Sequence, residues 1–197
     1  MKRFLFLVAA VMPGLCAAQN PQLDYIEKYA PLAIAEMERT GVPASITLAQ
    51  ALVESGAGRS VLAVRANNHF GLKCHGEWTG DTFYKDDDRA RECFRAYASA
   101  EDSYRAHSDF LRERERYQSL FDLDPTDYKA WARGLRQAGY ATDRRYAEKL
   151  IDSIEDFQLY RFDEQAFAQT APAPATPDLP QVAAAGERRI PVAVESL

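Results

Sequence analysis

Apolar residues recur every three to four positions along most of the chain, the spacing of one face of a helix. Pro31 falls inside the first such stretch and should kink or split it. The second stretch is apolar on most sides and ends at the small-residue loop 55–58, which leaves Glu54 in its last turn. The pattern predicts helices over residues 23–40, 45–54, 99–121, 127–138 and 143–160, with a short helix and a turn over 59–68.

Residues 69–97 break the helical period. They carry aromatic side chains separated by turn residues at Gly76, Gly80 and Asp86–Asp88. This combination predicts a small antiparallel sheet or hairpin. The predicted fold class is therefore mainly α, of the α+β kind: a helical core with one small antiparallel β-lobe inserted after the second helix.

The two ends of the sequence predict segments outside this domain. Lys2 and Arg3 precede a short apolar run, and small residues follow it, so residues 1–18 are predicted to be a signal peptide cleaved after Ala18. The apolar run is too short to span a bilayer, so we expect no membrane span in the mature chain. From residue 164 the composition shifts toward alanine and proline, which predicts a disordered tail over 164–197 and a catalytic domain over 19–163.

Charge and cysteine content add to the prediction of export that the signal peptide carries. The net charge of −5 argues against a nucleic-acid partner, which favours basic surfaces. If Cys16 leaves with the signal peptide, Cys74 and Cys93 remain, and a periplasmic or secreted location favours a disulfide between them. The alternative is two unpaired buried thiols.

Histidine and cysteine spacing does not predict a metal site. His69, Cys74 and His75 fit no standard zinc pattern, so we expect no metal and no cofactor. His107 lies on a predicted helix and is expected to be a partly buried, hydrogen-bonded side chain.

Glu54 is the candidate for acid chemistry. A general acid for glycoside cleavage must stay protonated near neutral pH, and burial beside apolar neighbours disfavours the ionised form. The negative end of a helix dipole acts in the same direction. Gly56 and Gly58 remove side-chain bulk behind Glu54, so a sugar could approach closely. The alternative is an exposed glutamate before a glycine cap.

Four sequence blocks carry a resemblance to a known family. The chain over residues 25–162 resembles the bacterial peptidoglycan β-N-acetylglucosaminidases, glycoside hydrolase family 73, which include autolysin domains and the muralytic domain of the flagellar rod-cap protein. The resemblance implies a lysozyme-like fold and cleavage after N-acetylglucosamine. The blocks, in the family's order, are AQALVESGAG (Ala49–Gly58), NNHFGLK (Asn67–Lys73), FRAYAS (Phe94–Ser99) and GYATDRRYAEKL (Gly139–Leu150).

The resemblance also implies roles for single residues. Glu54 matches the family's essential glutamate. Asn68 and Phe70 match the segment that lines the substrate groove, whereas Tyr140 and Tyr146 match a tyrosine-bearing block near the cleft.

Aromatic side chains are candidates for stacking on sugar rings. Trp78 in the predicted lobe belongs to this group, together with Phe70, Tyr84 and Tyr140. For each of them the alternative is ordinary core packing.

The resemblance does not identify a second catalytic carboxylate in this sequence. Family members carry a glutamate on the β-lobe, but the matching strand reads FYKDDD, and a rough alignment points to Asp87, with Asp86 next. The alternative for this run is a solvated acidic turn. Two mechanisms follow. In an inverting reaction the aspartate activates a water molecule, and its carboxyl group lies about 6.5–9.5 Å from the carboxyl group of Glu54. In the other, the substrate's acetamido group attacks, and Tyr140 or Tyr146 orients it.

The sequence thus predicts an enzyme that binds peptidoglycan strands and cuts them after N-acetylglucosamine, with Glu54 as the general acid. We expect a monomer. One alternative is a muramidase or lytic transglycosylase of similar fold, which would differ in its products. A second alternative is a non-catalytic module that binds the cell wall.

Overall fold

The computed structural model describes residues 20–75, 78–87 and 89–170. The predicted signal peptide and residues 171–197 of the predicted tail lie outside the described residues. In the described part of the chain, no helix combines the length and the apolar character needed to cross a membrane. The elements, in chain order, are α1 (Pro21–Thr40), α2 (Ala44–Ser55), α3 (Val61–Ala66), β1 (Thr82–Lys85), β2 (Glu92–Arg95), α4 (Ala100–Glu113), the 3₁₀ helix η1 (Glu115–Asp122), α5 (Tyr128–Gln137), α6 (Tyr146–Asp156) and α7 (Arg161–Thr170).

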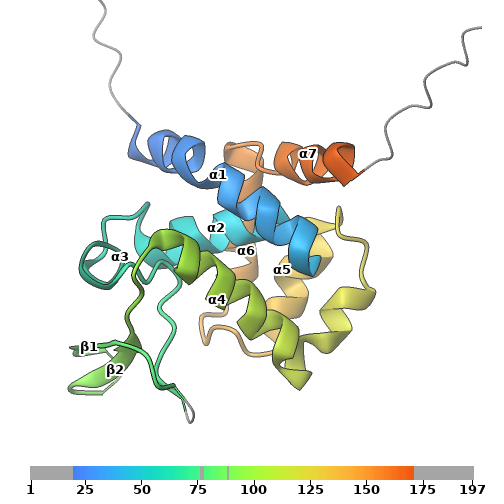
Figure 1. Cartoon of the computed structure of the whole chain (residues 1–197). Helices are drawn as coiled ribbons and strands as arrows, with labels where there is room; N and C mark the ends of the chain where they lie inside the picture. Colours follow the sequence, from blue (N-terminus) through green and yellow to red (C-terminus); the bar gives the residue numbers. More distant parts are fainter. Residues whose placement is uncertain (1–19, 76–77, 88, 171–197) are drawn as a thin grey trace, which may run out of the picture.

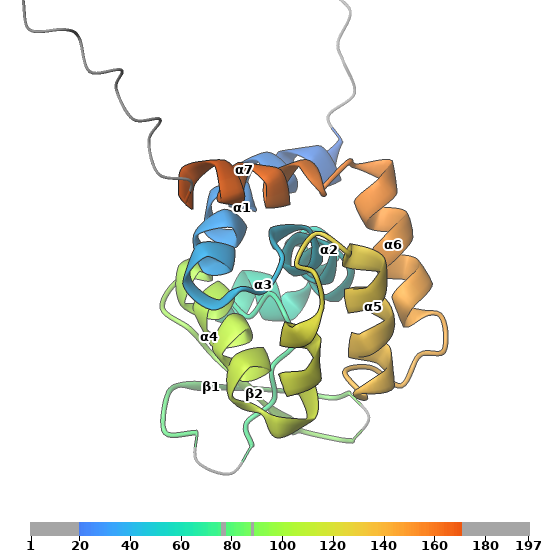
Figure 2. The ribbon, with the colours of Figure 1, turned by 90° about the vertical axis from the view of Figure 1, so that its right-hand side faces the viewer.

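Helix α2 lies at the centre of the molecule. Ten of its twelve residues are buried, and it packs against α1, α5, α6 and α7, which surround it in Figure 2. A helix that is apolar or small on all sides is suited to such a position. Because α2 is enclosed, its last turn is held firmly where it leaves the core.

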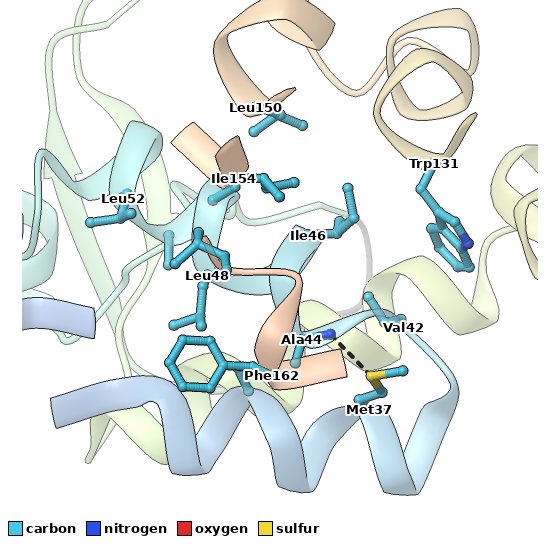
Figure 3. Packing of buried hydrophobic residues seen from close by; sticks show 14 of the residues in the cluster. Met37, Val42, Ala44, Ile46, Leu48, Leu52, Trp131, Leu150, Ile154 and Phe162 are labelled. Carbon is cyan, nitrogen blue, oxygen red and sulfur yellow. Dashed lines mark hydrogen bonds between the residues drawn. The ribbon is translucent and has the colours of Figure 1, made fainter. Parts of the chain in front are cut away.

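The core forms where side chains of α2 meet those of the surrounding helices (Figure 3). Leu48 of α2 and Ile154 of α6 are completely buried, and Trp131 of α5 is 1% exposed. Each buried side chain of this kind stabilises the fold by about 1.5–3 kcal/mol. The N–H of Ala44 donates to Met37 Sδ at 3.3 Å, which joins the end of α1 to the start of α2.

Helix α1 is continuous through Pro31, which is exposed. Its axis changes direction between its two ends (Figures 1 and 2), so the predicted kink is confirmed and the helix is not split. The proline removes one helical hydrogen bond, and its exposed position lets water satisfy the freed carbonyl.

Helix α7 corrects the predicted start of the tail. Residues 164–170, which the composition assigned to the tail, are helical, and Ala166 is 3% exposed. The helix lies beside α1 across one side of the bundle (Figure 1). The alanine-rich composition was misleading because alanine favours a helix when a packing surface is available.

Asp163 ties α7 to α2. Its side chain is 1% exposed, and Oδ1 accepts from the backbone N–H of Ser45 in the first turn of α2 at 2.8 Å. Burial raises the pKa of Asp163 to about 6, and the hydrogen bonds with Ser45 and the backbone of Ala44 only partly offset this.

Replacing Asp163 with alanine should lower the free energy of unfolding by about 1–2 kcal/mol, because the N–H of Ser45 loses its acceptor in the core. Urea denaturation of the two proteins measures the difference. Asp163→Asn keeps an acceptor and serves as the control. Equal stability of the alanine and asparagine variants would contradict the capping role.

The β-lobe lies between α3 and α4 (Figure 1). Strands β1 and β2 pair antiparallel, with Tyr84 opposite Cys93, and β1 contacts α3. Cys93 forms a disulfide with Cys74, with Cα atoms 5.4 Å apart. The predicted disulfide and the mainly α fold with one small antiparallel lobe are therefore confirmed. The short helix α3, predicted over 59–68, separates α2 from the lobe.

Candidate active site

Glu54 lies in the last turn of α2, where the helix leaves the core. Gly56 closes the helix in the left-handed conformation (φ 57°), and its N–H donates to the carbonyl of Leu52. The side chain of Glu54 is half-buried. The hydroxyl of Tyr146, at the start of α6, donates to Glu54 Oε1 at 2.9 Å. Two helices far apart in sequence therefore fix one carboxyl group.

The surroundings of Glu54 favour its protonated form. Burial raises its pKa above the ordinary value of a glutamate, and this outweighs the hydrogen bond from Tyr146 and the positive charge of Lys149. Gln50 Nε2 donates to the Tyr146 hydroxyl at 3.0 Å, so that hydroxyl's proton is directed to Glu54. The prediction of a partly desolvated carboxyl at the helix end is met by this geometry.

A groove of about 380 Å³ runs past Glu54 between the helices and the β-lobe. Its wall on the helical side comes from the 62–72 segment, α4 and the loop before α6, whereas the lobe supplies charged side chains. The lining residues are Glu54, Leu62, Phe70, Gly71, Leu72, Lys73, His75, Lys85, Asp87, Phe94, Phe110, Arg116, Tyr140, Ala141 and Thr142.

The structure brings Asp87 to the same groove as Glu54. Asp87 forms ion pairs with Lys73 at 3.3 Å and with Lys85 at 3.2 Å. Burial alone would raise the pKa of Asp87, but the hydrogen bonds and charges of the two lysines outweigh it and hold the pKa below the ordinary value. Asp87 is thus ionised at neutral pH, whereas the pKa of Glu54 is shifted in the opposite direction. Asp86 lines a neighbouring recess that Glu54 also borders.

Two aromatic residues named by the sequence line the groove. Phe70 stacks on the ring of His107 with centroids 3.9 Å apart. Tyr140 stacks on Tyr146 at 5.6 Å. Among the described residues, the hydroxyl of Tyr140 is buried and has no hydrogen-bond partner.

Three residues predicted to bind substrate lie elsewhere. Asn68 is 1% exposed, and its amide bonds only to the backbone of Leu72 and Arg95. Tyr146 is 2% exposed and contacts Glu54 rather than the groove. These two side chains support the wall of the groove from inside the fold, because each forms hydrogen bonds with polar groups that are buried away from water.

Trp78 is the third of these residues. It packs inside the lobe, edge-on to Tyr97 at 5.7 Å and under the guanidinium of Arg95 at 4.7 Å. Its indole N–H donates to the carbonyl of Asp81 at 2.9 Å. Trp78 is half-buried and is not among the residues that line the groove, and its role in substrate binding stays a prediction.

Two smaller predictions also need correction. His107 is completely buried, and neither ring nitrogen has a hydrogen-bond partner in the described chain. Burial accordingly lowers its pKa to about 3. A Cβ added at Gly58 would lie 2.9 Å from the ring of Tyr25. Gly58 thus makes room for a core tyrosine rather than for a sugar.

No three histidine, cysteine or acidic side chains of the described residues are grouped to hold a metal ion. Cys74 is engaged in the disulfide, and His69 Nδ1 pairs with the hydroxyl of Tyr25 at 2.7 Å.

Sequence reasoning missed the cations of the groove. Lys73 and Lys85 flank Asp87, and Arg116 lines the opposite wall. Lys73 belongs to the NNHFGLK block, which was the available signal, but its ion pair with Asp87 depends on the folding of the lobe. Arg116 belongs to an alternating run of charges that resembles an ordinary solvated helix face.

Replacing Tyr146 with phenylalanine should raise the pKa of Glu54 further, because the hydrogen bond that stabilises its ionised form is lost. A general acid works only while protonated, so the alkaline limb of the pH–rate profile should move to higher pH. The profile of kcat/KM on a muralytic substrate measures this shift. Tyr128→Phe, at a half-buried tyrosine whose hydroxyl donates to Glu155, is the control. An unmoved alkaline limb would contradict the role of Tyr146.

Comparison with known proteins agrees with this arrangement. Residues 30–159 match the glucosaminidase family model, described as mannosyl-glycoprotein endo-beta-N-acetylglucosaminidase. Peptidoglycan hydrolase FlgJ of Pseudomonas aeruginosa is 32% identical over 150 residues, which cover 70% of this chain and 37% of that protein. Exo-glucosaminidase LytG of Bacillus subtilis is 35% identical over 140 residues, covering 64% of this chain and 48% of the relative. The chain thus spans about half or less of these relatives.

Solved structures show the same fold. A peptidoglycan hydrolase from Sphingomonas sp. A1 superposes with a TM-score of 0.61 at 29% identity, over 79% of this chain and 99% of that one. The glycoside hydrolase domain of Salmonella typhimurium FlgJ superposes with a TM-score of 0.60 at 26% identity, over 76% and 96% of the two chains. The family match covers most of the described residues, including Glu54, Asp87 and Tyr146. This chain belongs to the glucosaminidase family of glycoside hydrolases.

Proposed function

We propose that this protein is a peptidoglycan hydrolase that cuts the glycosidic bond after N-acetylglucosamine, with Glu54 as its general acid. The observation that carries the proposal is the position of Glu54: a half-buried carboxyl with a raised pKa, bordering an open groove. Family membership supports the substrate class, since relatives of this chain are named peptidoglycan hydrolases and a glucosaminidase.

The two groove carboxylates suit opposite roles. Glu54 keeps its proton and donates it to the leaving oxygen, whereas Asp87 stays ionised beside its two lysines and activates water. Environments that push two pKa values apart support an acid and a base assignment. We therefore favour an inverting reaction with Asp87 as the base.

Tyr140 supports the second mechanism, in which the substrate's acetamido group attacks. Its side chain lines the groove, and its hydroxyl is buried without a partner in the described chain, so a small movement of the ring would let it donate to that group. In this mechanism Asp87 is not a reacting group, and the enzyme tolerates its loss.

Asp87→Asn distinguishes the two mechanisms. For an inverting reaction we expect kcat to fall about 10²–10⁴-fold, because a general base is removed, with partial recovery when azide replaces water as the nucleophile. Steady-state kinetics on soluble peptidoglycan, with and without azide, measure the fall in kcat and its recovery. Asp81→Asn, which changes an exposed aspartate of the lobe, is the control. A loss below tenfold without azide rescue would favour the acetamido mechanism.

Mass spectrometry of the products tests the function itself. Reducing N-acetylglucosamine ends are the expected result. Reducing muramic acid ends would identify a muramidase, and anhydromuramic ends a lytic transglycosylase. The lengths of the released fragments separate cleavage within strands, which we propose, from the exo activity named for the Bacillus subtilis relative.

The proposal includes a place and a state for the protein. We propose that residues 1–18 direct it to the periplasm or the exterior, where its substrate lies, and that it acts as a monomer. The mass of the purified extracellular protein tests cleavage after Ala18. Light scattering gives the oligomeric state.

A further inference from the structure

Arg114 and Arg116 stand at the edge of the groove, where α4 ends and η1 begins. The guanidinium of Arg114 lies 4.3 Å from the centroid of the Phe110 ring, and that of Arg116 lies 6.0 Å from the same ring. Arg116 also stacks on Tyr117 at 4.6 Å. Phe110 and Arg116 both line the groove that contains Glu54. Aromatic rings therefore hold two guanidinium groups beside the reaction site.

The two lysines of the groove form ion pairs with carboxylates, and these two arginines do not within the described chain. Lys73 pairs with Asp87 and Glu92, and Lys85 pairs with Asp87. Within the described chain, no carboxylate lies within ion-pair distance of Arg114 or Arg116, although the sequence alternates arginine with glutamate here.

The pKa of His75 reflects the positive potential that these cations create in the groove. His75 lines the groove on the lobe side, and its pKa is lowered first by burial and then by nearby positive charges. Four cations contribute to that shift: Arg114, Arg95, Lys73 and Arg116. This end of the groove is thus positive, although the whole chain carries a net charge of −5.

We propose that Arg114 and Arg116 bind a carboxylate carried by the muramic acid side of the substrate and so select anionic peptidoglycan over neutral glycans. Muramic acid bears either a free lactyl carboxylate or a peptide stem with its own carboxylates. Guanidinium groups recognise carboxylates by paired, charge-assisted hydrogen bonds. This inference rests on the proposed function and adds the specificity of the same groove.

The test uses one preparation of soluble peptidoglycan strands in three forms. The first is untreated, the second has its carboxylates converted to neutral amides with carbodiimide and ethanolamine, and the third has its stems removed by an amidase. The proteins are the wild-type chain, Arg114→Gln/Arg116→Gln and the control Arg105→Gln/Arg133→Gln, whose arginines are exposed on α4 and α5. The readout is kcat/KM from the release of reducing ends.

Charge-assisted bonds of this kind predict about a tenfold loss of kcat/KM for the wild type on the amidated strands. The groove double variant should be slow on untreated strands and respond less than twofold to amidation, whereas the control should behave as the wild type. A defect confined to stemmed strands assigns the peptide carboxylates, one confined to stem-free strands assigns the lactyl carboxylate, and one on both forms shows that the arginines bind either group.

Two results separate failure of this inference from failure of the proposed function. If the wild type cuts amidated and untreated strands equally, or the groove variant remains as sensitive to amidation as the wild type, the arginines do not bind the carboxylate. If the wild type releases no reducing ends from any form, the proposed function fails first.

Discussion

Glu54→Gln should reduce the release of reducing ends from peptidoglycan by at least about 10²–10⁴-fold, because glutamine has no proton to donate to the leaving oxygen. The amide keeps the size of the carboxyl group and can still accept the hydrogen bond that Tyr146 donates to Oε1. The fold and the melting temperature should therefore remain close to those of the wild-type protein. The measurement is the initial rate on purified sacculi, with circular dichroism as the check on folding.

Glu148→Gln is the matched control for this variant. Glu148 lies on α6, close to Tyr146, and its side chain is exposed in a surface ion pair with Arg145, so the same chemical change there should leave the rate unaltered. Undiminished digestion of sacculi by the Glu54 variant would refute Glu54 as the general acid, whereas a wild-type protein that digests no sacculi would favour a wall-binding module.

Replacing Cys74 and Cys93 with serine should lower the free energy of unfolding by about 3 kcal/mol, since the disulfide closes a loop across a separation of 19 residues. The same change loosens the lobe that carries Asp87, so kcat should fall as well. Urea denaturation with and without reductant measures the stability term. The stability of the double serine variant should be the same with and without reductant, because it has no disulfide to reduce. It therefore serves as the control for other effects of the reductant.

A thiol count offers an independent check of the bond. With Cys16 replaced by serine, the chain retains two cysteines. The unfolded, untreated protein should then yield no free thiols. Two reactive thiols would contradict the bond between Cys74 and Cys93.

The features that depend on local sequence could be predicted well. Glu54 was placed in the last turn of its helix because the apolar period and Gly56 are both local signals. The disulfide followed from cysteine number and expected compartment. The lobe followed from a change of period.

The features that depend on distant contacts could not. The hydrogen bond between Tyr146 and Glu54 joins residues 92 positions apart, and only the packing of α6 on α2 creates it. Asn68 was assigned to the groove with its sequence block, but its amide bonds to backbone groups inside the fold. Arg116 escaped attention because the turn from α4 into η1 directs it to the groove.

Glu54 and Asp87, the proposed acid and base, lie on elements that are packed into the fold to different extents. Glu54 lies at the end of an enclosed helix, whereas Asp87 lies in the turn between the two strands of a hairpin whose β1 contacts the short helix α3. Segments with few buried contacts open at low free energy. A movement of the hairpin would therefore change the separation of the two carboxylates more readily than a movement of α2 would.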